Sequence, residues 1–514
     1  MKLSRFAIAA AVAGLLMGGH AHAQQAGSRT AARAASTGFV DGQISARDIS
    51  YGPKDAPEPA SPSDQPMPMA PEADKEEEEE EEPTYKLHHG LFGRCLCCEE
   101  AEEEEECEPW RLFGNGCNAK CRKAKIDGWI VGGYVWNPYR PVDRFNGPQT
   151  WMDRANEVNM QELWFNFHKD VDTEGCGFDH GYNASVMYGT NARFLTAAGF
   201  EDRINKTGPF YGLAVPNLNY QFGLNDLKVT IGRFASPVGY AVIGQPNNHF
   251  NVLPYTFQYG EPFTHTGILG QYQITDDVNV GLGLVLGWDN FDKGFNRSEA
   301  MIATYTRTNV LKCGDTFAYF GIYGNEPNLD PALPSQRYGV AAPGFTPRYL
   351  QSLVYMRPIN DCWSYVFQSD FGVQQEPFGP NGRQAAMWYG VNQYAYRKIN
   401  DCWTWGVNAE WFRDDGGFRV GGFLPNFSNN NNGGPTGIRG LSPLRSGFDG
   451  SFYRVAIGPS YTPTKNLAMR SALVWDWYSG PAGPNGGINS LPFLNGSAPS
   501  RSQVVVTQDI VLKF

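Results

Sequence analysis

The final eleven residues of this 514-residue chain, VVVTQDIVLKF, alternate between apolar and polar side chains and end on an aromatic ring. Val506, Ile510 and Phe514 share one parity of the segment. Thr507 and Asp509 share the other parity. Because the side chains of a β-strand point alternately to its two faces, this two-residue period predicts a strand with one apolar and one polar face.

The same alternation recurs from Asp127 onward in segments about ten residues long, which is the length of strand that crosses a bilayer at a tilt. Clear examples are residues 278–288, 403–411 and 467–477. One face of each segment carries mostly Val, Leu, Met or Trp, and the other carries mostly Gly, Asn, Glu, Arg or Asp. This repetition predicts many strands of one kind.

The connections between these segments alternate between short polar turns and longer loops rich in Gly, Asn and Pro, such as residues 421–447. The short turns fall near Gly175-Cys176, Asn225-Asp226, Asp276-Asp277, Cys313-Gly314, Asn360-Asp361, Asn400-Asp401 and Thr464-Lys465. Seven such turns would join eight pairs of strands. In hydrocarbon every backbone polar group needs an internal hydrogen-bond partner, so the strands must close into a barrel. We therefore predict an all-β fold, a transmembrane antiparallel β-barrel of about 16 strands, within a range of 12–18.

Two of the short turns are near copies, INDCW at residues 359–363 and at residues 399–403. Their cysteines, Cys362 and Cys402, would lie two strands apart, at roughly 10 Å. That separation exceeds the usual reach of a disulfide. We predict that these two cysteines are not bonded to each other, while either could pair with an N-terminal cysteine.

Aromatic residues gather at the ends of the predicted strands, as at Trp288, Trp363, Trp403, Trp411 and Trp477. This placement is typical of the aromatic girdles at the two interfaces of a membrane barrel. A soluble β-sandwich is the alternative fold, but it would have turns of similar length at both ends. Outer-membrane lipid is therefore the surrounding that we expect for the outer face.

The two ends of the chain agree with export to a bacterial outer membrane. Residues 1–23 have a charged start, an apolar stretch too short to span a bilayer and the cleavage site Ala21-His22-Ala23, as in a secretory signal peptide. The terminal Phe514 is typical of the closing strand of an outer-membrane barrel, where the insertion machinery reads it. We predict that Phe514 is the insertion signal and that the barrel assembly machinery is a partner.

The formal net charge of −11 belongs mainly to a region that precedes the barrel. Residues 71–108 hold 17 acidic and 3 basic side chains, whereas residues 127–514 hold 31 acidic and 28 basic ones. Residues 24–85, rich in Pro, Ala and Glu, are predicted to be a disordered linker because they cannot bury enough apolar surface. A nearly neutral body gives no reason to expect a nucleic-acid partner.

Residues 86–125 are predicted to form a separate periplasmic module rich in Cys and Glu. In an exported chain its cysteines are first of all disulfide candidates. A metal site and free thiols are the alternatives, since CxxC occurs once and no His follows it, and we assign no metal and no cofactor. Whether the module acts as a plug or a tether stays open. The candidates are Cys95, Cys97, Cys98, Cys107, Cys117 and Cys121.

Two motifs lie close together in the barrel region. IGRFASPVGY at residues 231–240 is followed by PYTFQYGEPFTHTG at residues 254–267. They resemble the family of β-barrel porins related to OmpL, and the resemblance extends over roughly residues 128–514, including the terminal Phe. It implies an outer-membrane, porin-like protein and supplies no solute. The Cys- and Glu-rich region lies outside the family pattern.

A barrel of about sixteen strands is too wide for side chains to fill and can leave a water-filled channel. Polar residues of the inward parity are therefore candidates for the pore wall. Both signs of charge occur among them, so no strong ion preference is predicted. The candidates are Lys228, Thr230, Asn279, Gln368, Asp370, Asn408, Glu410, Arg454, Arg470, Asp476, Thr507 and Asp509.

The segment 236–262 is the best candidate for a constriction loop folded into the lumen. Many aromatic side chains in an exposed loop are costly unless they pack, and the barrel wall is the nearest surface. A cap over the barrel mouth is the alternative. The candidates are Tyr240, His249, Phe250, Tyr255, Phe257, Tyr259 and Glu261.

The predicted function is a porin-like channel for passive diffusion of small hydrophilic solutes. The chain has no GxSxG motif and no recognisable nucleophile constellation around its eight His residues, so we do not expect an enzyme. The alternative is a structural or adhesive barrel that anchors its surface loops or tethers the envelope through its N-terminal module. Porins of this size often form trimers, but no interface signature in the sequence decides between a homotrimer and a monomer.

Overall fold

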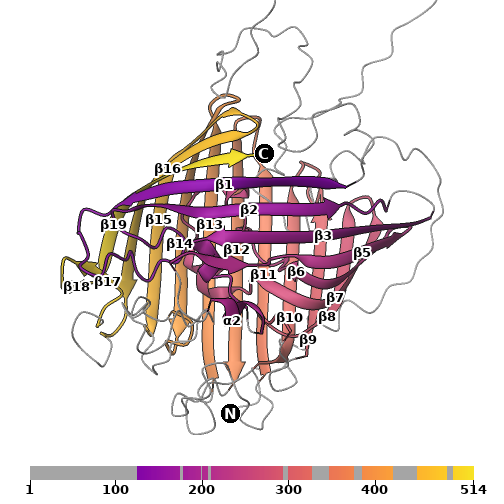
Figure 1. Ribbon diagram of the computed structural model, residues 1–514, viewed down its shortest axis with the longest axis horizontal. Helices are drawn as coiled ribbons and strands as arrows, with labels where there is room; N and C mark the ends of the chain where they lie inside the picture. Colours follow the sequence, from indigo (N-terminus) through magenta and orange to yellow (C-terminus); the bar gives the residue numbers. More distant parts are fainter. Residues whose placement is uncertain are drawn as a thin grey trace, which may run out of the picture. The chain divides into compact units, whose positions relative to one another are not determined.

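The computed structural model describes residues 124–514 apart from 174–176, 198, 206–209, 293–298, 327–346, 376–384, 421–447 and 483–489. The described strands other than β17 and β18 pair as one antiparallel sheet that closes on itself (Figure 1). The first half of the ring is β1 (Lys125–Trp136), β2 (Val158–Lys169), β3 (Phe178–Gly189), β5 (Leu218–Leu224), β6 (Leu227–Ala235), β7 (Thr264–Thr275), β8 (Val278–Val285) and β9 (Ala300–Thr308). The second half is β10 (Thr316–Asn325), β11 (Pro347–Pro358), β12 (Trp363–Gln375), β13 (Ala385–Lys398), β14 (Trp403–Asp415), β15 (Gly450–Thr464), β16 (Leu467–Ser479) and β19 (Ser502–Lys513).

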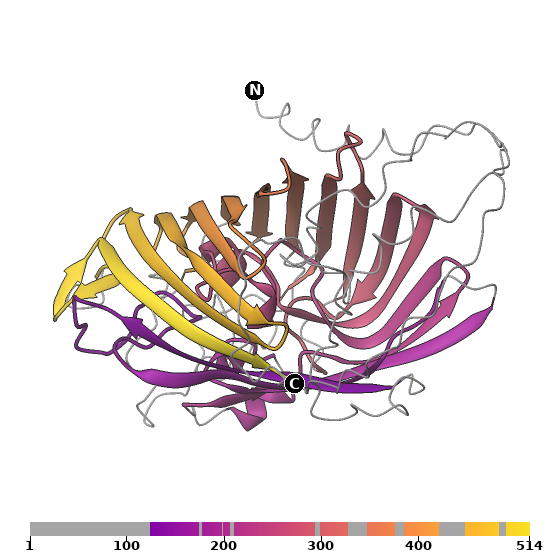
Figure 2. The same cartoon turned by 90° about the horizontal axis from the view of Figure 1, so that it is seen from above.

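The ring has sixteen strands, as the alternation of short and long connections predicts. It closes where β1 and β19 pair in antiparallel register, from Trp129 opposite Lys513 to Trp136 opposite Val506. Figure 2 shows the strands from above, following one another round the wall from β1 in indigo to β19 in yellow. Closure gives every strand two neighbours, so no sheet edge is left to face lipid.

The remaining regular elements are short and lie in the loops. The long connection between β3 and β5 holds the 3₁₀ turn η3 (Asn191–Arg193), the helix α2 (Glu201–Ile204) and the strand β4 (Gly212–Ala214), which pairs with the end of β3. A small hairpin of β17 (Phe493–Asn495) and β18 (Ala498–Ser500) precedes β19. No helix in the described part of the chain is long and apolar enough to cross a membrane.

The predicted tight turns join the strands that they were expected to join. Six of the seven lie within the described residues, and the seventh, between β2 and β3, includes residues outside them. The two INDCW turns share one geometry. The side-chain oxygen of Asn360 accepts hydrogen bonds from the N–H groups of Cys362 and Trp363 at 3.0 and 2.9 Å, and Asn400 does the same in its copy. Asn therefore builds the turn with its own side chain.

The two faces of the strands differ as their parity predicts. On β14, Trp405 and Val407 are 45% and 40% exposed, whereas Asn408 and Glu410 on the other parity are 3% and 5% exposed. On β8 the outward Leu284 is 67% exposed. An apolar outer face suits hydrocarbon, and the polar residues are turned to the inside.

One predicted girdle residue is wrong. Trp288 is buried and packs edge-to-face on Trp388, with ring centroids 5.9 Å apart, instead of facing lipid. The strand β8 already ends at Val285, and Gly287 and Asp289 both adopt positive φ (78° and 45°). These two residues break the two-residue period, so the parity of the strand no longer applies at Trp288.

The prediction for the repeated cysteines is confirmed. Cys362 carries a free, exposed thiol, whereas Cys402 is disulfide-bonded, so the two are not bonded to each other. The predictions for residues 1–123, which include the signal peptide, the linker and the six N-terminal cysteines, lie outside the described residues.

Candidate transport pathway inside the barrel

Residues 236–263, which connect β6 to β7, run through the inside of the barrel and are called here the internal segment. The segment contains η4 (Gln245–Asn247) and η5 (Thr256–Gly260). The segment forms hydrogen bonds with β2, β12, β14, β15, β16 and β19. In each case the strand contributes a side chain that points away from its exposed face. A segment that reaches so many strands on their unexposed faces can only lie within the ring.

Glu410 on β14 anchors the internal segment through three hydrogen bonds. Its carboxylate accepts hydrogen bonds from the N–H groups of Tyr255 and Thr256, at 2.7 and 2.6 Å, and from the Thr256 hydroxyl at 2.8 Å. Hydrogen bonds to a charged acceptor are the stronger kind, and these three are buried. They hold the start of η5 against the wall.

Two buried arginines continue the attachment on the neighbouring strands. Arg454 on β15 pairs with Asp476 through Nε at 2.7 Å and also donates to the carbonyl of Leu253. Arg470 on β16 pairs with Asp509 and donates to the Gln245 carbonyl at 2.6 Å and to the Asn248 carbonyl at 2.7 Å. Each guanidinium therefore joins one wall carboxylate to backbone oxygens of the segment, which leaves neither charge unpaired.

The aromatic residues predicted for the constriction loop all pack inside the barrel. Tyr240 lies 4.9 Å from Tyr394, and Tyr255 lies 5.1 Å from Phe452, between ring centroids. His249 lies 4.7 Å from Phe250 and approaches Gly458, whose carbonyl is 3.1 Å from its Nε2. The other two pack against the connection between β1 and β2: Phe257 contacts Trp151 edge-to-face at 5.3 Å, and the Tyr259 hydroxyl donates to the Pro148 carbonyl.

Glu261, the acid of the motif at residues 254–267, is also inside the barrel. Glu261 accepts a hydrogen bond from the amide of Gln368 on β12, whose side-chain oxygen accepts from the Tyr240 N–H at 3.1 Å. Gly239 adopts a φ of +74°, and a Cβ at this position would collide with the Glu261 carboxylate. The glycine of SPVG is therefore needed both for its backbone conformation and for the close approach of Glu261.

The two motifs that resemble the porin family, at residues 231–240 and 254–267, contact each other through a serine and a histidine. Ser236 Oγ lies 2.9 Å from His265 Nε2, and His265 Nδ1 lies 2.9 Å from the Gly287 carbonyl oxygen. Both side chains are fully buried, and a carbonyl, not a carboxylate, faces Nδ1. The pair joins the start of the internal segment to β7 and lacks the exposure that a nucleophile requires.

The twelve predicted pore-wall residues all carry the inward parity, but they differ in what covers them. Lys228 and Asn279 are half-buried, and the other ten are buried. Five of those ten bond to the internal segment: Gln368, Glu410, Arg454, Arg470 and Thr507. Asp370, Asp476 and Asp509 each bond to one of these five. Asn408 donates to the Gln393 carbonyl, and Thr230 is buried on β6.

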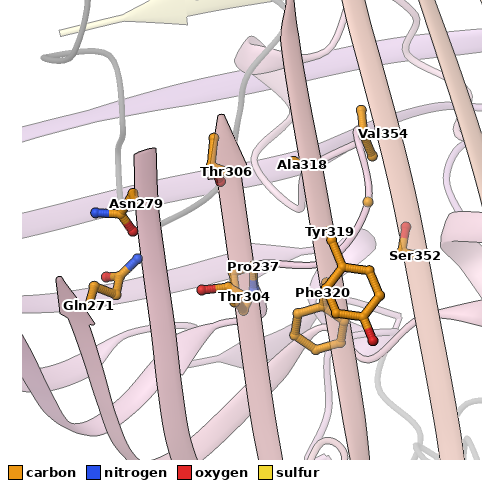
Figure 3. A pocket seen from close by; sticks show the side chains of 11 residues that line it. Pro237, Gln271, Asn279, Thr304, Thr306, Ala318, Tyr319, Phe320, Ser352 and Val354 are labelled. Atoms are coloured by element: carbon orange, nitrogen blue, oxygen red, sulfur yellow. The ribbon is translucent and has the colours of Figure 1, made fainter. Parts of the chain in front are cut away.

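A pocket lies between the start of the internal segment and the inner faces of β7 to β11 (Figure 3). It has an empty volume of about 420 Å³, part of which is open to solvent. Thr304 and Thr306 on β9 and Asn279 on β8 are half-buried there. The lining residues are Pro237, Gly239, Gln271, Asn279, Thr304, Thr306, Ala318, Tyr319, Phe320, Ser352 and Val354.

Burial also changes the protonation of groups in the loops. It lowers the pKa of His249 to about 4, helped by the nearby charge of Arg470 and opposed by the Gly458 carbonyl. Beyond the end of β10, burial raises the pKa of Glu326 to about 7, opposed by Arg348 at 3.6 Å. The neutral imidazole of His249 is the form that fits its packed place within the barrel.

Sequence reasoning missed two buried acids that organise the loops. Glu162 on β2 accepts from the indole of Trp129 at 2.7 Å, from Asn191 at 3.0 Å and from the N–H of Gln245 at 3.2 Å. Glu201 pairs with Arg233 at 3.1 Å, and both are buried. The position of Glu162 on the inward-facing side of its strand could have indicated that it is buried. The partner of Arg233 comes from a loop, and no periodicity predicts it.

The barrel has relatives in sequence and in structure. The family model described as "Putative beta-barrel porin-2, OmpL-like" matches residues 123–514. Among curated proteins no relative is found. Solved structures that match include the outer membrane channel DcaP of Acinetobacter baumannii (10% identity, 76% of this chain and 97% of that chain, TM-score 0.47) and Pseudomonas putida OprB at high pH (13%, 76% and 94%, 0.47). An anion-selective porin from Comamonas acidovorans also matches (9%, 76% and 99%, 0.44).

The family and the fold point to a channel, not an enzyme, and to the outer membrane. This chain belongs to the OmpL-like family of β-barrel porins.

Proposed function

We propose that this protein is an outer-membrane channel through which small hydrophilic solutes diffuse passively. The observation that carries the proposal is the position of the internal segment. It is bonded to β12–β19 on one side of the interior and leaves half-buried polar side chains, among them Asn279 and Thr304, beside a pocket on the other side. Such a polar wall can replace part of the water around a passing solute.

In this proposal the internal segment narrows the pore and sets the size of solute that passes. All but five of its residues are buried, because its aromatic side chains pack against the wall and its backbone bonds to Glu410, Arg454 and Arg470. A segment fixed in this way is a static constriction. Solutes would cross by diffusion down their gradient without any conformational step.

The predicted pore-wall residues then divide into two groups. We propose that Lys228 and Asn279, which are half-buried, belong to the wall of the open passage. The buried anchors Glu410, Arg454 and Arg470 would act by positioning the internal segment instead of contacting solute.

The test is the swelling of proteoliposomes in isotonic sugars of increasing size, with the purified full-length mature protein. We expect fast swelling in glucose and a decline with larger sugars. A variant in which residues 240–259 are replaced by a short Gly/Ser turn should admit larger sugars, provided that heat-modifiable mobility shows a folded barrel. An unchanged size limit in this folded variant would refute the constriction.

If the folded wild-type protein gives no swelling in any sugar, the channel proposal fails in favour of a barrel that anchors surface loops or tethers the envelope. Three predictions remain beside the proposal: assembly into a homotrimer, recognition of Phe514 by the barrel assembly machinery, and a periplasmic place for the Cys- and Glu-rich region. Light scattering of the detergent-solubilised protein would measure the first.

A further inference from the structure

We infer that the solute path of this channel runs along the inner face of β5–β10 and serves uncharged, hydroxyl-rich solutes. The inference rests on the proposed channel function and adds to it the place of the path and the class of solute. It follows from an asymmetry between two parts of the wall. The inner face of β5–β10 is named here the neutral arc, and the inner face of β12–β19 the charged arc.

The neutral arc presents amides and hydroxyls to the interior. The registers of β7, β8 and β9 place Gln271 opposite Gly281, Gly281 opposite Thr304, and Asn279 opposite Thr306, all on one face. The four polar side chains of this group line the pocket. Figure 3 shows Gln271, Asn279, Thr304 and Thr306 on neighbouring strands, all at the same pocket.

Among the described residues of the neutral arc, Lys228 is the one charged side chain of inward parity. It lies opposite Gln271 in the register of β6 and β7, at the end of β6 next to the Asn225-Asp226 turn. The inward His265 of β7 is buried, and its two ring nitrogens lie 2.9 Å from Ser236 Oγ and from the Gly287 carbonyl oxygen. The arc therefore offers hydrogen-bond donors and acceptors with a single formal charge.

The charged arc differs because its ionised groups are covered. Arg454 pairs with Asp476, and Arg470 pairs with Asp509, at side chains no more than 3% exposed. The carboxylate of Glu410 is occupied by three hydrogen bonds from the internal segment. These charges hold the segment, so a passing ion meets them only across a layer of protein.

The side of the internal segment that faces the pocket is uncharged as well. Pro237 and Gly239 line it, and both are half-buried in an otherwise buried part of the segment. Glu261, the acid nearest to them, is buried behind Gly239 and bonded to Gln368. The pocket between the segment and the neutral arc thus has polar but almost uncharged walls.

These walls fit a solute with many hydroxyl groups and no charge. Amide and hydroxyl side chains donate and accept hydrogen bonds, as sugar hydroxyls do, and require no counter-ion. The passage would therefore sort solutes by size and hydrogen bonding and only weakly by charge.

The test compares two isosteric charge insertions, Asn279→Asp on the neutral arc and Asn408→Asp on the charged arc. Both residues are inward-facing asparagines, but Asn279 is half-buried beside the pocket and Asn408 is buried. Reversal potentials are measured in planar bilayers across a tenfold KCl gradient with the full-length mature protein. Swelling of proteoliposomes in glucose is measured in parallel, and heat-modifiable mobility confirms folding.

For the wild type we expect a potassium-to-chloride permeability ratio within about threefold of one and rapid swelling in glucose. A unit charge about 8 Å from an ion in water changes its local concentration by roughly two- to threefold, so Asn279→Asp should shift the ratio toward potassium by about that factor. Asn408→Asp should leave it unchanged.

An equal or larger shift in folded Asn408→Asp would overturn the inferred path. A wild-type ratio more than about tenfold from one would overturn the inferred solute class, since one exposed charge cannot produce it. So would ion conductance without swelling in glucose. Absence of both conductance and swelling in the folded wild type would instead refute the channel function itself.

Discussion

Replacing Glu410 by alanine should release the internal segment from the wall. The carboxylate accepts the N–H groups of Tyr255 and Thr256 at 2.7 and 2.6 Å, and both donors are buried. The alanine side chain has no acceptor, and the space left by the missing carboxylate lies inside the barrel. Two backbone donors would then lose their partners at the point where η5 begins.

The expected loss of free energy that holds the internal segment follows from the number of hydrogen bonds that the substitution removes. A buried donor left without its acceptor costs about 1–3 kcal/mol, so the two N–H groups together cost about 2–6 kcal/mol of the free energy that holds the segment in place. Glu410→Gln keeps one acceptor oxygen, so its cost should be roughly half of this, about 1–3 kcal/mol. The Thr256 hydroxyl can rotate toward another acceptor and is left out of the estimate.

Hydrogen exchange of the peptide spanning residues 253–260, read by mass spectrometry, measures the effect directly. Each 1.4 kcal/mol changes an equilibrium about tenfold, so a loss of 2 kcal/mol should speed exchange of the two amides at least about 30-fold. Asn392→Ala is the matched control. Asn392 lies opposite Glu410 in the register of β13 and β14, and its side chain makes no hydrogen bond to any described residue.

If exchange in Glu410→Ala rises no more than in Asn392→Ala, the carboxylate does not hold the segment. A rise that spreads equally over peptides of β7 and β8 would show a general loss of barrel stability instead of a local release. Either result would refute the reasoning from the three hydrogen bonds.

Three further predictions concern other parts of the chain. We propose that Phe514 is the insertion signal, so deleting it should lower the yield of heat-modifiable barrel in cells. The deletion also removes the ring that lies against Gly128, where a Cβ would come within 2.8 Å of it. A normal yield would contradict the proposed role. Because burial lowers the pKa of His249 from 6.5 to about 4, the unfolded state takes up its proton first as the pH falls. The internal segment should therefore lose stability between about pH 6.5 and 4, seen as faster hydrogen exchange at pH 5 than at pH 7 after correction for intrinsic rates, and His249→Gln should remove most of this difference. Under non-reducing conditions a maleimide should label Cys362 and leave Cys402 unlabelled, as peptide mapping would show; labelling of both would contradict the free and bonded states assigned to them.

The number of strands and the direction of their side chains could be predicted because both depend on short-range pattern. The two-residue period assigns Gln368, Glu410 and Arg454 to the inner face, and register and burial agree with that assignment. The Asx turns of INDCW mark where strands reverse. These features need no knowledge of what lies across the barrel.

What covers each inner residue could not be predicted from the same pattern. Glu410 meets Thr256, which is 154 positions away in the chain, and Arg470 meets Gln245, which is 225 positions away. No periodicity connects such pairs, since the closed ring alone brings them together. The parity rule therefore treats Glu410 and Asn279 alike, although one anchors a buried segment and the other faces a pocket.

The parity rule also fails where a strand ends or a loop returns. Trp288 turns inward after the positive φ angles of Gly287 and Asp289, and the rule that held for Leu284 does not reach it. Arg233 shares the parity of the exposed Ile231, yet it is buried because Glu201 from the β3–β5 connection pairs with it. Both cases depend on loop conformations that composition does not determine.

Single-channel conductance of the purified, refolded mature protein in planar bilayers tests the central claim most directly. We expect stable conductance steps of uniform size, because a fixed internal segment leaves one passage of fixed width beside β5–β10. A barrel that is folded by heat-modifiable mobility but gives no steps over many insertions would contradict it.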